Sequence, residues 1–221
     1  MPGYPQVDLG EGFVRQHELL ERLHEDISSA YIALEGERSS QYLRRCVVRA
    51  VFSFIEAVIE CIKWELRSSV RKGFFTGRLS EKEQETLGSP HVIGPRDDRF
   101  LPLDQNIKRT FRLAAKLWKL KAFRLNTDGE EFRCFLLAKS ARNRLTHPKT
   151  VYDIEVTDND MHCYSVACMW VQAEFARLIG AKISSLAGDL PESDRDALMQ
   201  MFKGQWVNPP RIHPSSIHSA L

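Results

Sequence analysis

The sequence of 221 residues lacks an apolar run that could span a membrane without carrying several charges. Each charge near the centre of a bilayer would cost about 3 kcal/mol. The most apolar stretch, residues 46–66, contains Arg49, Glu56, Glu60, Lys63 and Glu65. The N-terminal residues also lack the basic and apolar regions of a secretory signal peptide. We therefore expect a cytoplasmic protein with no membrane contact, in which residues 46–66 belong to a buried helix.

Paired cysteines are missing as well. The chain has five cysteines, an odd number, and no Cys-x-x-Cys motif. This pattern argues against a disulfide framework and against a structural zinc site, which needs four matched ligands. There is also no cluster of carboxylates of the kind that binds Mg²⁺. We expect reduced, buried thiols and a protein that uses neither a metal nor another cofactor.

Charge of one sign is not in excess either, because 31 Lys and Arg residues stand against 29 Asp and Glu residues, for a net charge of +2. Such a balance excludes a histone-like protein that binds nucleic acid over its whole surface. Any binding of RNA must come from local clusters of cations. The length and the 43% of hydrophobic residues suit a single globular domain.

Apolar residues recur at helical spacing along most of the chain, and no segment has the alternation of a strand. The predicted fold class is all-α, a helical bundle. We expect an N-terminal tail at 1–13, one helical domain at 14–205 and a flexible C-terminal tail at 206–221. The predicted helices cover residues 14–34, about 40–71, about 103–125, about 130–147 and about 158–186, with a last short helix from Ser193 to Lys203.

Residues 73–104 interrupt this pattern with several glycines and prolines. Ser80 followed by Glu83 has the spacing of a capping box and predicts a short helix within the segment. We expect an insertion that leaves the bundle rather than a second domain. Long irregular segments are often functional, so this insertion could also bind a ligand or a neighbouring protein.

The predicted helix 103–125 carries seven cations with no acid between them: Lys108, Arg109, Arg112, Lys116, Lys119, Lys121 and Arg124. Lys108, Arg112, Lys116 and Lys119 would share one face, because they follow one another at steps of four, four and three. This face is either a solvated helix surface or a strip that contacts phosphates. The second interpretation predicts RNA binding that depends on salt and little on sequence.

The segment with the clearest chemistry is Arg142-Asn143-Arg144-Leu145-Thr146-His147-Pro148. Thr127-Asp128-Gly129-Glu130 predicts a turn and a capping box at the start of its helix, and Pro148 predicts that the helix ends at His147. A histidine can take or give a proton near neutral pH, and an arginine can stabilise the charge that builds on a phosphate. Asn143 precedes His147 by four residues and could orient its imidazole.

Arg142, the polar Asn143 and His147 at a helix end resemble the Arg-x(4–6)-His motif of the HEPN superfamily. The resemblance extends to the helical order of residues 14–186, but its specific part is the six residues 142–147. HEPN domains are helical bundles that typically form dimers. Many are metal-independent endoribonucleases of toxin, antiviral defence or RNA-processing systems.

The resemblance implies a homodimer in which Arg142 and His147 of both chains form one composite site that cleaves RNA. The products would carry a 2′,3′-cyclic phosphate and a 5′-hydroxyl. Further RNA contacts are expected from Arg144, Lys149, Lys108, Arg112, Lys116 and Lys119. A cognate antitoxin or a regulatory protein is a further expected partner. Lys149 stands where many toxins paired with nucleotidyltransferase antitoxins carry tyrosine, so the sequence departs from that branch.

A structural role for the motif is the alternative. Arg142 could pair with Glu56 or Glu60 of the preceding long helix, while His147 interacts with the carbonyl end of its own helix. The chain would then be a catalytically inactive helical module that binds RNA, a nucleotide or a protein.

Overall fold

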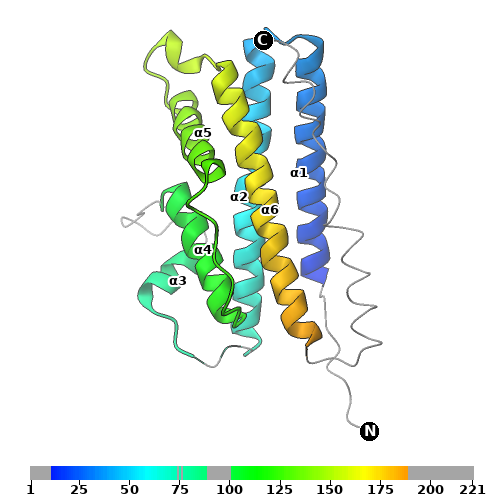
Figure 1. The fold of residues 1–221 in the computed structure, drawn as a ribbon, viewed down its shortest axis with the longest axis vertical. Helices are drawn as coiled ribbons and strands as arrows, with labels where there is room; N and C mark the ends of the chain where they lie inside the picture. The colour runs from blue at the N-terminus through cyan, green and yellow to red at the C-terminus, as the bar shows by residue number, and fades with distance from the viewer. Residues whose placement is uncertain (1–10, 74, 76, 89–100, 189–221) are drawn as a thin grey trace.

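The computed structural model describes residues 11–73, 75, 77–88 and 101–188. Three long helices run along the bundle: α1 (Glu11–Gly36), α2 (Gln41–Arg71) and α6 (Asp158–Ala187). Beside them, α4 (Leu103–Leu117) and α5 (Glu130–Thr146) lie one below the other and together cover the remaining side (Figure 1). The described residues form helices and no strand, which confirms the predicted all-α class.

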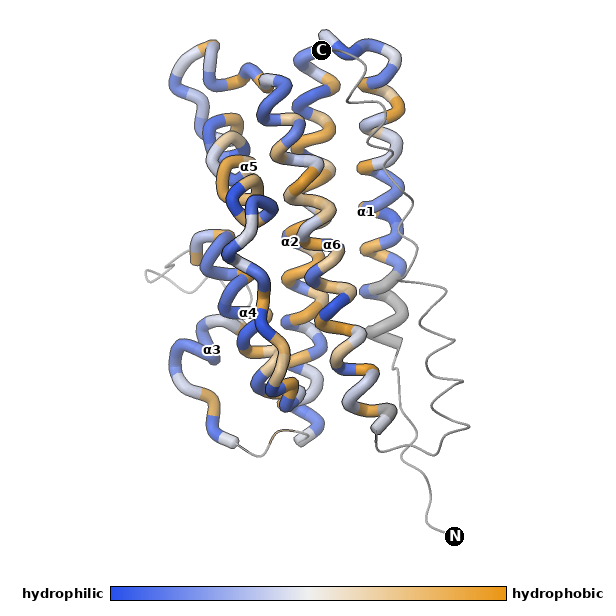
Figure 2. Tube along the Cα trace, in the orientation of Figure 1, coloured by the Kyte–Doolittle hydropathy of each residue, from blue (hydrophilic) through white to orange (hydrophobic). Residues whose placement is uncertain are grey.

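The core lies where α2 faces α1, α4 and α6. Apolar positions of α2 and α6 recur on their inward sides, and Figure 2 shows the hydrophobic residues concentrated along these two helices. Val51, Ile55 and Leu66 of α2 are fully buried, and so are Tyr164 and Leu178 of α6. This burial explains why α2 holds 31 residues in one helix, as the sequence predicted. No described helix is long and apolar enough to cross a membrane.

The polar residues of α2 recur at steps of four and three and form a partly buried stripe along the helix: Arg49, Ser53, Glu56, Glu60, Lys63 and Arg67. Lys63 is only 3% exposed, and its ammonium lies 3.1 Å from the Glu60 carboxylate. Arg67 contacts the same carboxylate at 3.4 Å and donates to the backbone oxygen of Leu87. Through Arg67, the C-terminal part of the stripe thus attaches the end of α3 to the bundle. Glu56, nearer the N-terminus of α2, remains accessible to solvent.

The helix predicted over 103–125 ends at Leu117, which corrects the prediction. Lys119 adopts a left-handed backbone with φ of 57°, the conformation that usually ends a helix at a glycine. Two backbone bonds complete this end, from Lys119 N–H to Lys116 O and from Leu120 N–H to Ala115 O. Because no glycine occupies this position, no stop signal is present in the sequence there. Four of the seven cations are on α4, and three follow it.

Residues 118–129 return along the bundle to the start of α5. Gly129 is the N-cap of α5 and has no side-chain cap, so the capping box predicted at Thr127–Glu130 is wrong. At its other end α5 stops as predicted: Thr146 is its last residue, and His147 leaves the helix with φ of −127° and ψ of 60°.

The predicted short helix in the insertion is α3 (Glu81–Leu87), and its capping box between Ser80 and Glu83 is present. The helix packs against α2 and α4, and Thr86 and Leu87 are buried. The part of the insertion that the structure describes therefore belongs to the bundle.

A short 3₁₀ helix, η1 (Val151–Ile154), connects α5 to α6 and was not predicted. The helix predicted from about residue 158 begins at Asp158, as expected, and Thr157 and Asp160 form a capping box at its start. At the other end of the bundle, α1 begins at Glu11 rather than at Val14. The predicted helix 193–203, the C-terminal tail 206–221 and residues 1–10 of the N-terminal tail lie outside the described residues.

Candidate functional site

Arg142 lies on the side of α5 that faces α2. Its guanidinium contacts the Glu56 carboxylate at 2.8 Å and lies over the Phe52 ring, 5.8 Å from the ring centre. A weaker contact of 3.5 Å joins it to the side-chain oxygen of Asn143. The ion pair with Glu56 is the one that the structural alternative predicted. Since the Arg142 side chain is still 34% exposed, it remains open to a ligand.

Arg142 lines a groove between α2 and α5, which we call the α2/α5 groove. Its volume is about 350 Å³, and it is lined by Arg45, Val48, Arg49, Phe52, Ser53, Glu56, Arg142, Leu145 and Thr146. Three guanidinium groups thus face one carboxylate. Arg45 and Arg49 were not predicted as site residues. Their spacing could have revealed a polar face of α2, because Arg45, Arg49 and Ser53 follow one another at steps of four.

His147 and Asn143 are both exposed at the end of α5. The backbone N–H of His147 donates to the Asn143 carbonyl oxygen at 3.0 Å, which is the last helical bond of α5. The groove is lined up to Thr146, and the His147 side chain is not among its lining residues. Within one chain the imidazole therefore lies at the rim of the α2/α5 groove.

Arg144 does not line this groove and instead connects the end of α5 to η1 and to the start of α6. It donates to the backbone oxygens of Tyr152 and Glu155 and pairs with the Asp160 carboxylate at 3.0 Å. Its contacts within the chain give it a structural role, beside the RNA contact expected from the sequence. Lys149 is exposed in the turn that follows.

The turn after the motif is well ordered by hydrogen bonds. The Asp153 carboxylate accepts the backbone N–H groups of Lys149 and Thr150, and these bonds lower the pKa of Asp153 below its usual value. On the other side, Gln41 exchanges two hydrogen bonds with the backbone of Val156. The segment that follows His147 is thus held by both α2 and α5.

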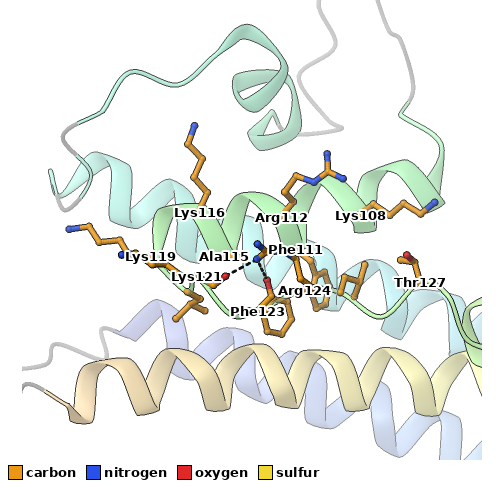
Figure 3. A pocket seen from close by; sticks show the side chains of 12 residues that line it. Lys108, Phe111, Arg112, Ala115, Lys116, Lys119, Lys121, Phe123, Arg124 and Thr127 are labelled. Atoms are coloured by element: carbon orange, nitrogen blue, oxygen red, sulfur yellow. Dashed lines mark hydrogen bonds between the residues drawn. The ribbon is translucent and has the colours of Figure 1, made fainter.

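The predicted phosphate-binding cations lie in a second and larger groove, of about 810 Å³. This α4 groove is formed by α4 and the return segment 118–127 (Figure 3). Its cations are the four predicted ones and two that were not assigned to a site: Lys108, Arg112, Lys116, Lys119, Lys121 and Arg124. Lys116 is paired with Glu83 at 2.6 Å, and Lys108 lies over the Phe132 ring.

The two grooves are formed by different elements: one by α2 and the C-terminal end of α5, the other by α4 and the return segment. Figure 1 shows α4 and α5 one below the other along the same side of the bundle. Phe132, beside Lys108, precedes Arg142 by ten residues on α5, which corresponds to about 15 Å along the helix axis. Arg112 and Lys116 follow Lys108 toward the C-terminal end of α4, and Figure 1 shows α4 running away from α5 in that direction. One chain therefore does not bring the α4 cations, which were expected to make further RNA contacts, next to Arg142 and His147.

The cysteines are free, and four of the five are buried. Burial raises the pKa of the Cys163 thiol to about 11, which disfavours the reactive thiolate. Among the described residues, no group of three or more His, Cys, Asp or Glu side chains is arranged to hold a metal ion.

No family model, no curated protein and no solved structure matches this chain. The resemblance to the HEPN superfamily therefore rests on the segment 142–147 and on the order of the helices.

Proposed function

We propose that the protein is a metal-independent endoribonuclease and that the α2/α5 groove, together with His147, is its active site. The observation that carries this proposal is the placement of Arg142. It is partly exposed in a groove with two further arginines, and the exposed His147 follows at the end of the same helix.

The groove suits the phosphate of an RNA strand. A guanidinium offers several N–H donors in a planar fork that matches phosphate oxygens. Glu56 engages one nitrogen of Arg142 and fixes the side chain, which leaves other donors for the substrate. Arg45 uses one nitrogen to bind the carbonyl oxygen of Ile154. The three arginines outweigh Glu56 in charge, so the groove attracts an anion.

In the proposed reaction, the 2′-oxygen of one nucleotide attacks its own 3′-phosphorus, and the bond from phosphorus to the 5′-oxygen breaks. One His147 accepts the 2′-proton, and the partner subunit's His147 gives a proton to the leaving 5′-oxygen. Arg142 stabilises the charge on the phosphate oxygens in the transition state. The products are a 2′,3′-cyclic phosphate and a 5′-hydroxyl, and the reaction needs no metal.

The surface of α5 supports the dimer that this mechanism requires. Leu136 and Leu137 are 37% and 46% exposed. Leu136 precedes the exposed Asn143 by seven residues and so lies on the same side of α5, and Leu137 adjoins it at the edge of this exposed face. Next to the end of α5, Val151 and Tyr152 of η1 are more than 70% exposed. A symmetric contact through this face would cover the exposed apolar side chains and bring two His147 side chains together.

Incubation with a single-stranded RNA in EDTA tests the proposal. We expect cleavage by the wild type, with 2′,3′-cyclic phosphate ends, and loss of cleavage in His147→Ala. His162→Ala is the matched control, because His162 is exposed on α6 away from the groove. Equal activity of His147→Ala and the wild type would refute the assignment, and so would activity that disappears with EDTA.

A second candidate is the catalytically inactive module that binds RNA or a protein. The contacts of Arg142 favour it, because the ion pair with Glu56 and the contact with the Phe52 ring are also those expected of a purely structural arginine. This candidate predicts RNA binding that is unchanged in His147→Ala and no cleavage by any form of the protein.

A further inference from the structure

The return segment that forms one wall of the α4 groove is firmly attached to α6. The buried Glu174 accepts the backbone N–H of Asn126, and the Trp170 indole donates to the Asn126 carbonyl oxygen. Arg177 donates to the backbone oxygen of Arg124 at 2.8 Å and lies over the Phe123 ring. The groove is therefore preformed, and a ligand would not need to order its walls.

Three cations of this groove have no partner among the described residues: Arg112, Lys119 and Lys121. All three are exposed, and Figure 3 shows Arg112 extending from the middle of α4 and Lys119 from its end. No carboxylate lines the groove, and the nearest acid contact is that of Glu83 with Lys116. The groove therefore carries an excess of positive charge in a chain that is nearly neutral as a whole.

The aromatic rings of the groove are not available for stacking with bases. Phe111 is fully buried, and Phe123 is only 8% exposed. The cations instead follow a line: Lys108 to Lys116 spans about 12 Å along α4, a length over which a stacked nucleic-acid strand places about three to four phosphates, and Lys119 follows after the helix end. These features favour contacts with the backbone of a strand over recognition of its bases.

We propose that the α4 groove is a second RNA site, which holds the phosphate backbone of a single-stranded segment of the substrate independently of its sequence. The choice of RNA as ligand rests on the proposed function. Because the two grooves are formed by different elements and share no lining residue, the α4 groove contributes to binding and not to the chemical step. Its loss raises KM and leaves kcat unchanged.

Binding is tested with the full-length chain carrying His147→Ala, so that the RNA stays intact whether or not the wild type cleaves it. The probe is a fluorescent oligouridine of roughly 20 nucleotides, long enough to cover a groove of this length. The test variant adds Arg112→Gln and Lys121→Gln. The matched control adds Arg22→Gln and Arg38→Gln, which remove the same charge from α1 and the turn after it, on the other side of the bundle.

The groove variant should bind about 25-fold more weakly at roughly 0.1 M salt, because each lost phosphate contact costs about fivefold there. The slope of log affinity against log salt should fall by about 1.4, since each contact to a single strand contributes about 0.7. The control should keep the affinity and the slope of the parent.

Equal affinity and slope in the groove variant and the control would overturn the proposal. So would displacement of the oligouridine by inorganic tripolyphosphate at the same phosphate concentration, which would indicate a site for small anions. Tighter binding of double-stranded RNA than of oligouridine would also overturn it. None of these results bears on whether His147 cleaves RNA, which the EDTA experiment decides separately.

Discussion

The two basic grooves differ in how their charge is held. In the α2/α5 groove, all cations are arginines, and the one that carries the motif, Arg142, is fixed by Glu56 and by the Phe52 ring. In the α4 groove, four of six cations are lysines, and no carboxylate is among the lining residues. A fixed guanidinium fork suits the orientation of one phosphate, whereas unpaired ammonium groups suit attraction to many. Under our proposal, the first groove performs the chemistry and the second supplies affinity for RNA.

Replacing arginine by lysine in each groove gives the largest expected difference. Arg142→Lys keeps the charge but loses the planar fork, so kcat should fall by about 10²–10³. Arg112→Lys in the α4 groove should leave both kcat and KM within about twofold, because a phosphate contact there needs only the charge. Steady-state kinetics on a single-stranded RNA measures both. A similar fall in the two variants would remove the distinction between the grooves.

Disrupting the exposed face of α5 should affect only the α2/α5 groove. Leu137→Glu places a charge in the proposed dimer contact, so sedimentation should show a monomer, and cleavage should fall by about tenfold or more. RNA binding through the α4 groove should persist. Ile32→Glu is the control, since Ile32 is 69% exposed on α1. A Leu137→Glu protein that remains dimeric would exclude this face as the interface.

Glu83 is the acid that partly neutralises the α4 groove. The hydrogen bond from Lys116, followed by those from the backbone and side chain of Ser80, lowers the pKa of the Glu83 carboxyl. The unfolded chain therefore takes up this proton at a higher pH, near the ordinary value of 4.5. The stability that Glu83 contributes is complete above that pH and disappears as the pH falls through the lower value of the folded protein.

The measurement is the melting temperature of the wild type and of Glu83→Gln as a function of pH. The two curves should be separated above pH 4.5 and converge below it. Curves with a constant separation down to the lowest pH would contradict the role of Glu83 in attaching α3 to α4.

The smallest expected effects come from replacing Lys119, a change that should alter stability and RNA binding in opposite directions. Because its left-handed backbone costs about 1 kcal/mol in a residue other than glycine, Lys119→Gly should raise the free energy of unfolding by up to about that amount. The same change removes a cation and should weaken RNA binding about fivefold at roughly 0.1 M salt. Lys121→Gln should weaken binding equally without the gain in stability. Denaturant unfolding and oligouridine titration measure the two effects.

Some helix boundaries could be predicted from the sequence, whereas the end of α4 near Lys119 could not. The long helix α2 was predicted because its apolar positions recur over its whole length, and the start of α6 because Thr157 and Asp160 form a capping box. The end of α4 was missed, because a lysine in the left-handed conformation leaves no mark in the sequence. The return segment that follows is held by tertiary contacts with α6, such as those of Asn126, and local sequence does not reveal these.

The candidate site was predictable to a similar degree. The segment from Arg142 to His147 and its position at a helix end followed from the local sequence, and Glu56 was one of two predicted partners of Arg142. Which glutamate pairs with Arg142 depends on how α5 packs on α2, and spacing along one helix does not determine this. For the same reason, the sequence did not indicate that the α4 cations and Arg142 line two separate grooves.

The most direct test of a site shared by two chains is a mixing experiment. Wild-type and His147→Ala chains are co-expressed with different tags in equal amounts, and the rate of RNA cleavage in EDTA is measured per total protein. A composite site that needs His147 from both chains predicts a rate of about one quarter of the wild type, because only dimers of two wild-type chains are active. A rate of about one half would mean that each chain cleaves on its own and would contradict the composite site.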